Sequence, residues 1–161
     1  MKITCLGQAG FLFEYKNTKI MIDPYLSNSV ASHQPQNERR FPVDESFFNI
    51  KPDVMVITHN HGDHYDKETF NRFITSESKA VILCPSSVWN DARGRGGENN
   101  FILFNVGTSI TVNEIVFMAV KAVHSDDYAI GVVIKADGEK YYITGDTLYN
   151  ESIFKRSRAH V

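Results

Sequence analysis

Short runs of apolar and β-branched residues, separated by turn-forming residues, recur along the chain in a pattern typical of β-strands. The first three runs are divided at residues 7–10 and 16–18 and end at Asp23-Pro24, which predicts an antiparallel meander. Two later runs are continuously apolar, which indicates strands buried on both faces. The predicted strands cover residues 2–6, 11–15, 19–22, 54–58, 80–84, 101–105, 109–112, 115–123, 129–136 and 140–144.

Two helices are expected between these strands. The Asp66 side chain can cap a helix over residues 67–74, and Pro85 marks the break before a shorter helix over residues 86–92. Residues 27–44 form a long polar loop, and a loop of this length is usually functional or mobile. The order of strands, βα units and further strands predicts one α/β domain over residues 1–161, with mixed sheets and helices packed outside them.

Composition and charge narrow the class of protein. The 161 residues are 42% hydrophobic and 12% aromatic, which is enough to form a core and argues against disorder. The formal net charge of -2 gives no electrostatic reason to expect nucleic acid or an anionic membrane as a partner. No run approaches the ~18 apolar residues of a membrane span, and the N-terminus lacks a signal peptide. We therefore expect a cytoplasmic protein whose cysteines, Cys5 and Cys84, are buried and reduced.

The segment after the fourth predicted strand carries the clearest chemistry, because three histidines and an aspartate fall within six residues. Side chains two residues apart on extended backbone point the same way, so His59 and His61 can reach one metal ion together. Gly62 permits a tight turn that directs Asp63 and His64 toward a second point. Imidazole suits zinc and similar metals, and a carboxylate can hold a second ion. The position after a buried strand is where α/β sheets place ligand sites.

This His-x-His-x-Asp-His pattern resembles the hallmark of the metallo-β-lactamase superfamily. Residues 6–11 and 22–24 look like the first hairpin of the branch that contains ascorbate-6-phosphate lactonase and related metal-dependent hydrolases. Residues 122–127 and 143–147 look like the segments that supply a third histidine and a metal-bridging aspartate. The resemblance extends along the whole chain and implies a layered αββα sandwich.

The resemblance also implies a set of ligands for two divalent metal ions, with zinc as the first choice and manganese or iron as alternatives. Asp63 and Asp146 would be the catalytic carboxylates. The implied ligands are His59, His61 and His124 for the first ion, Asp63 and His64 for the second, and Asp146 as the bridge between the two ions. Without the resemblance, His124 is also compatible with a core histidine and Asp146 with a turn carboxylate.

Other polar residues near these segments have two interpretations. Asp23 can orient an imidazole or can simply end a strand at a turn. Asp126 and Asp127 are expected to be solvated loop residues. The long loop adds three residues that either contact a phosphate or carboxylate of the substrate or lie on a solvated surface, namely His33, Arg39 and Arg40.

The implied activity is a metal-dependent hydrolase acting on a small-molecule substrate. A metal-bound hydroxide would attack a lactone, an ester or a sugar-phosphate lactone, and the ions would stabilise the oxyanion. A phosphodiester is the alternative substrate. A hypothesis of another class is a truncated, impaired member that acts only as a metal-binding or subunit-association module.

The C-terminus departs from the superfamily pattern, which calls for a last histidine on a later strand. The chain ends fifteen residues after Asp146, with a basic segment over residues 155–158. We therefore expect the C-terminal half of the sandwich to lack its final helix and strands, and we expect uncovered strands to cause self-association. His160 is a candidate for the last ligand.

Overall fold

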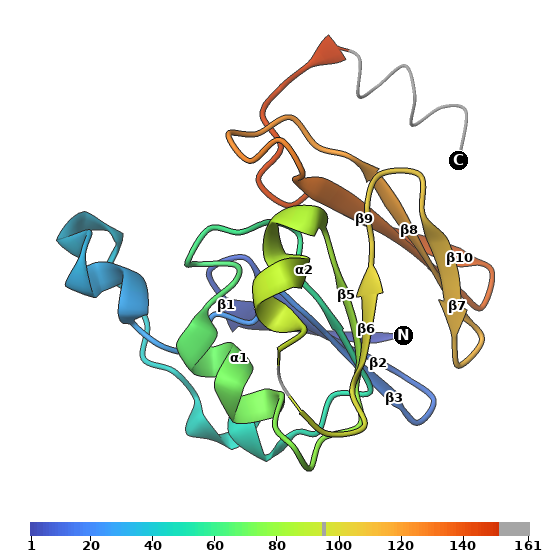
Figure 1. Ribbon diagram of the computed structural model, residues 1–161, viewed down its shortest axis with the longest axis horizontal. Coiled ribbons are helices and arrows are strands. Elements are labelled where there is room, and N and C mark those ends of the chain that lie inside the picture. The colour runs from blue at the N-terminus through green and yellow to red at the C-terminus, as the bar shows by residue number, and fades with distance from the viewer. Residues whose placement is uncertain (95, 152–161) are drawn as a thin grey trace.

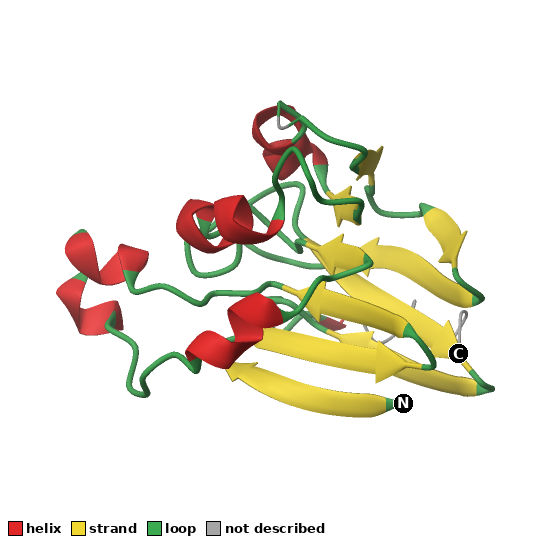
Figure 2. Ribbon diagram, turned by 90° about the horizontal axis from the view of Figure 1, so that it is seen from below, coloured by secondary structure: helices red, strands yellow, loops and turns green. Residues whose placement is uncertain are grey.

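Two β-sheets lie face to face, and two α-helices cover the outer side of the first sheet (Figure 1). The computed structural model describes residues 1–94 and 96–151. A view turned by 90° shows the helices gathered on one side of the strands (Figure 2). The helices are α1 (Lys67–Phe73) and α2 (Ser86–Ala92), preceded by short 3-10 helices η1 (Ser29–Ser32), η2 (Pro35–Asn37) and η3 (Glu45–Asn49).

The first sheet is mixed and the second is antiparallel. In the first sheet, β1 to β3 form the predicted meander, and β3 to β6 are parallel. Its strands, in spatial order, are β1 (Lys2–Gly7), β2 (Gly10–Tyr15), β3 (Thr18–Ile22), β4 (Val54–Val56), β5 (Val81–Cys84) and β6 (Asn100–Leu103). The second sheet contains, in spatial order, β10 (Glu139–Ile143), β9 (Ile130–Ala136), β8 (Ile115–Lys121) and β7 (Ser109–Val112).

The predicted strands and helices all have counterparts, and local contacts explain the start of α1 and the end of β4. Asp66 caps α1 as expected, because its carboxylate accepts hydrogen bonds from the backbone N–H groups of Glu68 and Thr69. The fourth strand was predicted to reach Thr58 but ends at Val56. The reason is that the Thr58 N–H donates to the Asp23 side chain, at 2.8 Å, instead of continuing the ladder.

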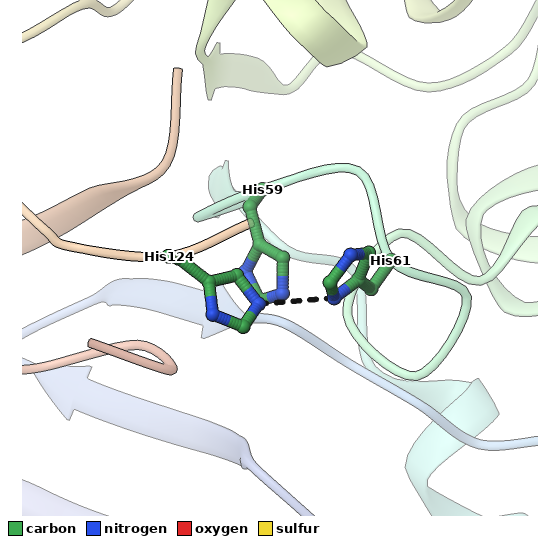
Figure 3. Close-up of side chains that lie close together, drawn as sticks. All are labelled: His59, His61 and His124. Atoms are coloured by element: carbon green, nitrogen blue, oxygen red, sulfur yellow. Dashed lines mark hydrogen bonds between the residues drawn. The ribbon is translucent and has the colours of Figure 1, made fainter. Parts of the chain in front are cut away.

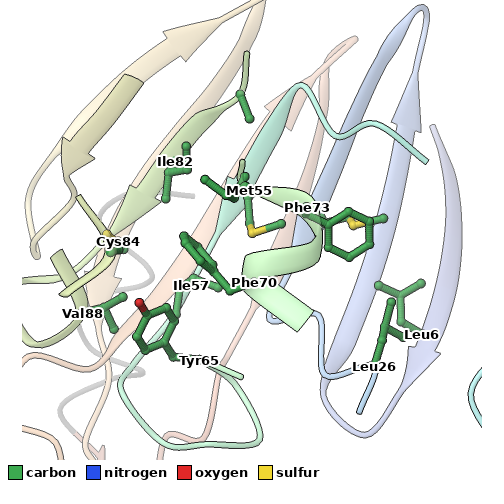
Figure 4. Close-up of a cluster of buried hydrophobic side chains, with 14 of the residues drawn as sticks. Leu6, Leu26, Met55, Ile57, Tyr65, Phe70, Phe73, Ile82, Cys84 and Val88 are labelled. Carbon is green, nitrogen blue, oxygen red and sulfur yellow. The ribbon is translucent and has the colours of Figure 1, made fainter. Parts of the chain in front are cut away.

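The first sheet is buried on both faces, as its continuous apolar strands predicted. Along β4, Val54 and Val56 face the second sheet, whereas Met55 packs under the helices. The cluster beneath α1 and α2 includes Phe70 and Val88 and is shown in Figure 4. None of the helices in the described part of the chain combines the length and hydrophobicity that a bilayer crossing requires.

Strand direction brings four chain segments to one end of the molecule. β3 and β4 are parallel, so Asp23 and the segment after β4 leave the first sheet at the same edge. β8 and β10 both run antiparallel to β9, so His124 and Asp146, each three residues beyond its strand, leave the second sheet at one edge. The Ile130 N–H donates to the Thr58 carbonyl oxygen, at 3.0 Å, and joins the two edges.

The two cysteines occupy different environments, and the prediction that both are buried was wrong for one of them. Cys84 is buried at the end of β5, whereas Cys5 is exposed on β1. β1 lies at the edge of the first sheet, where alternate side chains face solvent. Both thiols are free.

We predict that only Cys5 reacts with a thiol reagent in the folded protein between pH 7 and 9. Burial raises the pKa of the Cys84 thiol to about 12, so this thiol stays protonated in that range and is also shielded from the reagent. Peptide mapping by mass spectrometry after brief iodoacetamide treatment measures the two sites separately. The Cys5→Ser variant should show almost no labelling until denaturant is added, and rapid labelling of native Cys84 would contradict the burial.

The outer face of the second sheet carries partly exposed apolar side chains. Register places Met118 opposite Ser109 on this face, with Val133 opposite both Met118 and Tyr142. The Tyr142 ring lies over Gly131, where an added Cβ would be 2.9 Å from the ring. The described residues place no α-helix against this face, so they supply three of the four layers expected of the sandwich.

Self-association through this face stays a prediction. An exposed apolar patch on a sheet favours contact with another chain, so size-exclusion chromatography with light scattering should give a mass above that of one chain. Val133→Lys should shift the protein toward the monomer, whereas Glu77→Lys, on an exposed loop after α1, should not. A monomer at all concentrations tested would refute the prediction.

Candidate metal centre

His59 lies at the centre of two groups of potential metal ligands. In the first group, the ligand atoms of His59, His61 and His124 all lie within 4.8 Å of one another. In the second group, the ligand atoms of His59, His64 and Asp146 meet the same limit. Figure 3 shows the three imidazoles of the first group converging from two loops. Both groups contain His59, so the orientation of its ring affects the geometry of each group.

The contacts of the His59 ring leave one nitrogen available to bind a metal. The Thr58 hydroxyl donates its proton to Asp23 Oδ2, at 2.6 Å, so its oxygen accepts a hydrogen bond from His59 Nδ1, at 3.0 Å. The proton of the neutral ring therefore resides on Nδ1, and Nε2 keeps its lone pair. Nε2 is buried and has no hydrogen-bond partner among the described residues. A buried acceptor without a partner is costly, and a bound metal ion would satisfy it.

Asp23 orients the imidazole of His64. Of the two roles considered for Asp23, this contact supports the orienting role over that of a simple strand end. The Asp23 side chain is buried, and Oδ2 lies 2.8 Å from His64 Nδ1 while Oδ1 accepts the Thr58 N–H. The other ring nitrogen of His64, Nε2, lies 3.1 Å from Asp146 Oδ1. Burial alone would lower the pKa of His64, but its hydrogen bond to Asp23 and the charges of Asp23, Asp146 and Asp63 raise it to about 9. In the metal-free protein a proton therefore bridges His64 and Asp146, where an ion would bind both.

The imidazoles of the first group lie close together, and contacts of their ring nitrogens hold them there. His124 Nε2 lies 3.0 Å from His61 Nδ1, and the Ser125 hydroxyl lies 3.3 Å from His61 Nε2. Burial, followed by the charge of His64, lowers the pKa of His59 to about 4. His59 is thus neutral at pH 7, in the form that binds a metal. Three imidazoles form a donor set that suits zinc.

The comparison with known families agrees with this geometry. The family model described as the β-lactamase superfamily domain matches residues 18–160. The chain belongs to the metallo-β-lactamase superfamily. Membership accounts for the two facing sheets and for a ligand-rich loop directly after a buried strand, and it confirms the fold predicted from the motif.

Relatives in the superfamily are longer than this chain. A metal-dependent hydrolase of Pyrococcus furiosus is 33% identical over 156 residues, which cover 91% of this chain and 62% of that protein. A metal-dependent hydrolase of Korarchaeum cryptofilum is 27% identical over 149 residues, which cover 91% and 60%. The chain therefore spans about 60% of the length of the curated relatives it matches.

Two solved structures share the fold of this chain. A metallo hydrolase from Ignicoccus hospitalis is 24% identical, with a TM-score of 0.67, over 92% of this chain and 62% of that one. A diiron β-hydroxylase from Streptomyces venezuelae is 16% identical, with a TM-score of 0.76, over 99% of this chain and 32% of that one. These likenesses concern the fold alone.

The superfamily ligands predicted from the sequence are not all brought together. Asp63 follows Gly62 in the metal-binding loop, but its carboxylate belongs to neither group of ligands found among the described residues. Its charge still acts on His64. The assignment of Asp63 to the second ion stays a prediction. His160, the candidate for the last ligand, lies outside the described residues.

One residue outside the ligand set, Asp126, differs from expectation. Asp126 was predicted to be solvated but is buried, with 9% exposure, whereas Asp127 is exposed as expected. Burial by itself raises the pKa of Asp126, but hydrogen bonds from Ser87, Tyr128 and Asn60 outweigh this effect and lower the pKa.

The three candidate substrate-contacting residues of the long loop have different environments in the structure. Arg39 is turned inward, where its guanidinium donates to the carbonyl oxygens of Tyr25 and Leu6. His33 and Arg40 are exposed. Arg39 therefore anchors the loop, and the contact of His33 or Arg40 with a substrate stays a prediction.

We predict that loss of either His59 or His61 removes tight binding of the first ion and leaves the second group able to bind through His64 and Asp146. His59→Ala should no longer bind the first ion tightly, because Nε2 is the ring nitrogen left free for a metal and it can bind one ion. His61→Ala should weaken only the first group, since the second contains no atom of His61. Zinc titration of the metal-free protein against a chromogenic chelator, with metal counting by mass spectrometry, measures both effects. His33→Ala, at an exposed histidine outside the site, is the control. Unchanged zinc content in His59→Ala would refute the site.

Proposed function

We propose that the chain carries the metal-binding core of a metal-dependent hydrolase that acts on a small-molecule lactone, ester or sugar-phosphate lactone. The observation that supports this most directly is the buried, partnerless Nε2 of His59, which belongs to both groups of potential ligands. Relatives named metal-dependent hydrolases support the reaction class. The lactone or ester is inferred from the resemblance of residues 6–11 and 22–24 to the lactonase-containing branch.

Two divalent ions, with zinc as the first choice, fit the donors that are present. His59, His61 and His124 would hold the first ion, and His64, Asp146 and Asp63 would complete the second. When bound, the ions would activate water for attack and stabilise the negative charge that develops on the substrate oxygen. Manganese or iron is the alternative metal, since carboxylate ligands also suit harder ions.

The residues of the chain have separate roles in this proposal. Asp23 and Thr58 fix the orientation of His64 and His59, so that the ring nitrogens opposite their hydrogen bonds face the site. Asp146 is the carboxylate best placed to receive a proton during the reaction, because its side chain is 43% exposed and adjoins His64. The exposure of Asp146 and the burial of His59 support a reacting centre that lies between solvent and the two sheets.

The cellular compartment and the alternative functions are also part of the proposal. The exposed Cys5 and the buried Cys84 are both free thiols, which is typical of a reducing compartment such as the cytoplasm. A phosphodiester is the alternative substrate, supported by the ability of two-metal sites to clamp a phosphoryl group. A role limited to metal binding or subunit association is the alternative of another class.

We predict that the zinc-loaded protein hydrolyses a small lactone or ester and that this activity depends on Asp146. Asp146→Asn should lower kcat by about 100-fold or more, the loss typical of removing an acid–base group. Asp63→Asn should also lower turnover, whereas Asp127→Asn, at an exposed residue, should leave it unchanged. Rates are measured on a panel of γ-lactones, p-nitrophenyl esters and bis-p-nitrophenyl phosphate.

The panel also distinguishes the alternatives. Turnover of the phosphodiester in preference to the lactones and esters would support the alternative substrate. A fully zinc-loaded protein without turnover on any member of the panel would refute the hydrolase proposal for this chain and favour the binding module. An Asp127→Asn variant as impaired as Asp146→Asn would show that the loss does not come from the site.

A further inference from the structure

Asp126 is a buried carboxylate that connects three segments of the chain around the metal site. Its Oδ2 accepts hydrogen bonds from the backbone N–H of Asn60, at 3.1 Å, and from the hydroxyl of Ser87, at 2.6 Å. Its Oδ1 accepts the backbone N–H of Tyr128, at 2.9 Å. Asp126 belongs to neither group of ligands.

The position of these bonds relates them to the first group of ligands. Asn60 lies between His59 and His61 in the chain, and Asp126 lies two residues after His124. A single carboxylate oxygen therefore links the loop that carries two of the imidazoles to the loop that carries the third. These loops come from different sheets, and 66 residues separate the bonded pair.

The two oxygens of Asp126 have different tasks. The Oδ1 bond to Tyr128 spans two residues and is an ordinary feature of a polar turn. The Oδ2 bonds are long-range and join the loop after β8 to the loop after β4 and to the first turn of α2. Hydrogen bonds to a charged acceptor are roughly twice as strong as neutral ones, so this junction holds its backbone more firmly than an amide would.

We propose that Asp126 is the positioning residue of the first metal group: it holds the backbone between His59 and His61 in register with His124, so that the three imidazoles converge before an ion binds. This inference rests on the proposed metal site, although it does not require hydrolysis. Asp126 acts through the ligands and does not contact the ion. Ser87 completes the junction by tying it to the helix.

The decisive variant is Asp126→Asn, which keeps the size of the side chain. An amide can offer its single oxygen to Tyr128 or to Asn60 but not to both, because its nitrogen is a donor and cannot accept an N–H. Zinc affinity of the first group should therefore fall about 10- to 100-fold, as is usual when a group that orients metal ligands is lost. Ser87→Ala removes one of three donors and should cause a smaller loss in the same direction.

Affinity is measured by chelator competition on full-length, metal-free protein in the His64→Ala background, where the second group is disabled and one ion reports the first. The absorption spectrum of the Co²⁺-substituted protein gives a readout of ligand geometry independent of activity, and Asp126→Asn should change it. Asp127→Asn is the matched control, because this neighbouring carboxylate is exposed. Thermal unfolding of the metal-free proteins shows whether each variant is folded.

The outcomes separate the inference from the proposed function. Native-like zinc affinity and an unchanged Co²⁺ spectrum in a folded Asp126→Asn variant would overturn the positioning role and leave the metal site intact. An equal loss in Asp127→Asn would overturn it as well. If Asp126→Asn does not fold, Ser87→Ala decides, and unchanged affinity there counts against the inference. Absence of zinc binding by the native chain would overturn the metal site, and the positioning role with it.

Discussion

The hydrogen bonds between Asp23 and Thr58 are the interaction on which the rest of the site depends. They join the ends of two adjacent parallel strands, β3 and β4, in a place where neither side chain reaches water. A buried carboxylate is tolerated only when its acceptor sites are filled, and removing one partner of a buried charged pair costs about 3–5 kcal/mol. Asp23 meets this requirement by accepting two hydrogen bonds from Thr58 and one from His64.

This requirement has a direct consequence for the histidines. The Thr58 hydroxyl has one proton and donates it to Asp23, so it can only accept a hydrogen bond from His59 Nδ1, and the tautomer of His59 follows from the position of Asp23. His64 is oriented by the same carboxylate oxygen. Its ring centre lies 4.0 Å from that of His59, too close for both rings to be charged without cost. The raised pKa of His64, which lies between Asp23 and Asp146, and the lowered pKa of His59 favour a charged His64 and a neutral His59.

Much of the fold and part of the site could be predicted from the sequence, because both rest on local patterns. Periodicity and turn residues located the strands, and the spacing of His59 and His61 indicated a shared ion. Contacts between distant segments could not be read in this way. Asp126 follows a strand in a polar run, as a solvated residue would, and its burial depends on Asn60 and Ser87, which are far away in the chain. Cys5 sits in an apolar run, yet its exposure depends on β1 being an edge strand.

The long loop before β4 also depends on contacts between distant segments, and it packs against the turn that carries the candidate ligands. Arg39 crosses back to the Leu6 carbonyl, and the space that it occupies exists because residue 7 is a glycine with φ of 88°: an added Cβ there would lie 2.5 Å from the guanidinium. Val30 of the same loop lies 3.2 Å from the Cβ position of Gly62 in the metal-binding loop, and Ser29 donates to Asp66, the cap of α1. A glycine in the first hairpin thus lets an arginine anchor the loop that packs against the metal-binding turn. The sequence motif names the candidate ligands, and this packing of distant loops supports the turn on which they lie.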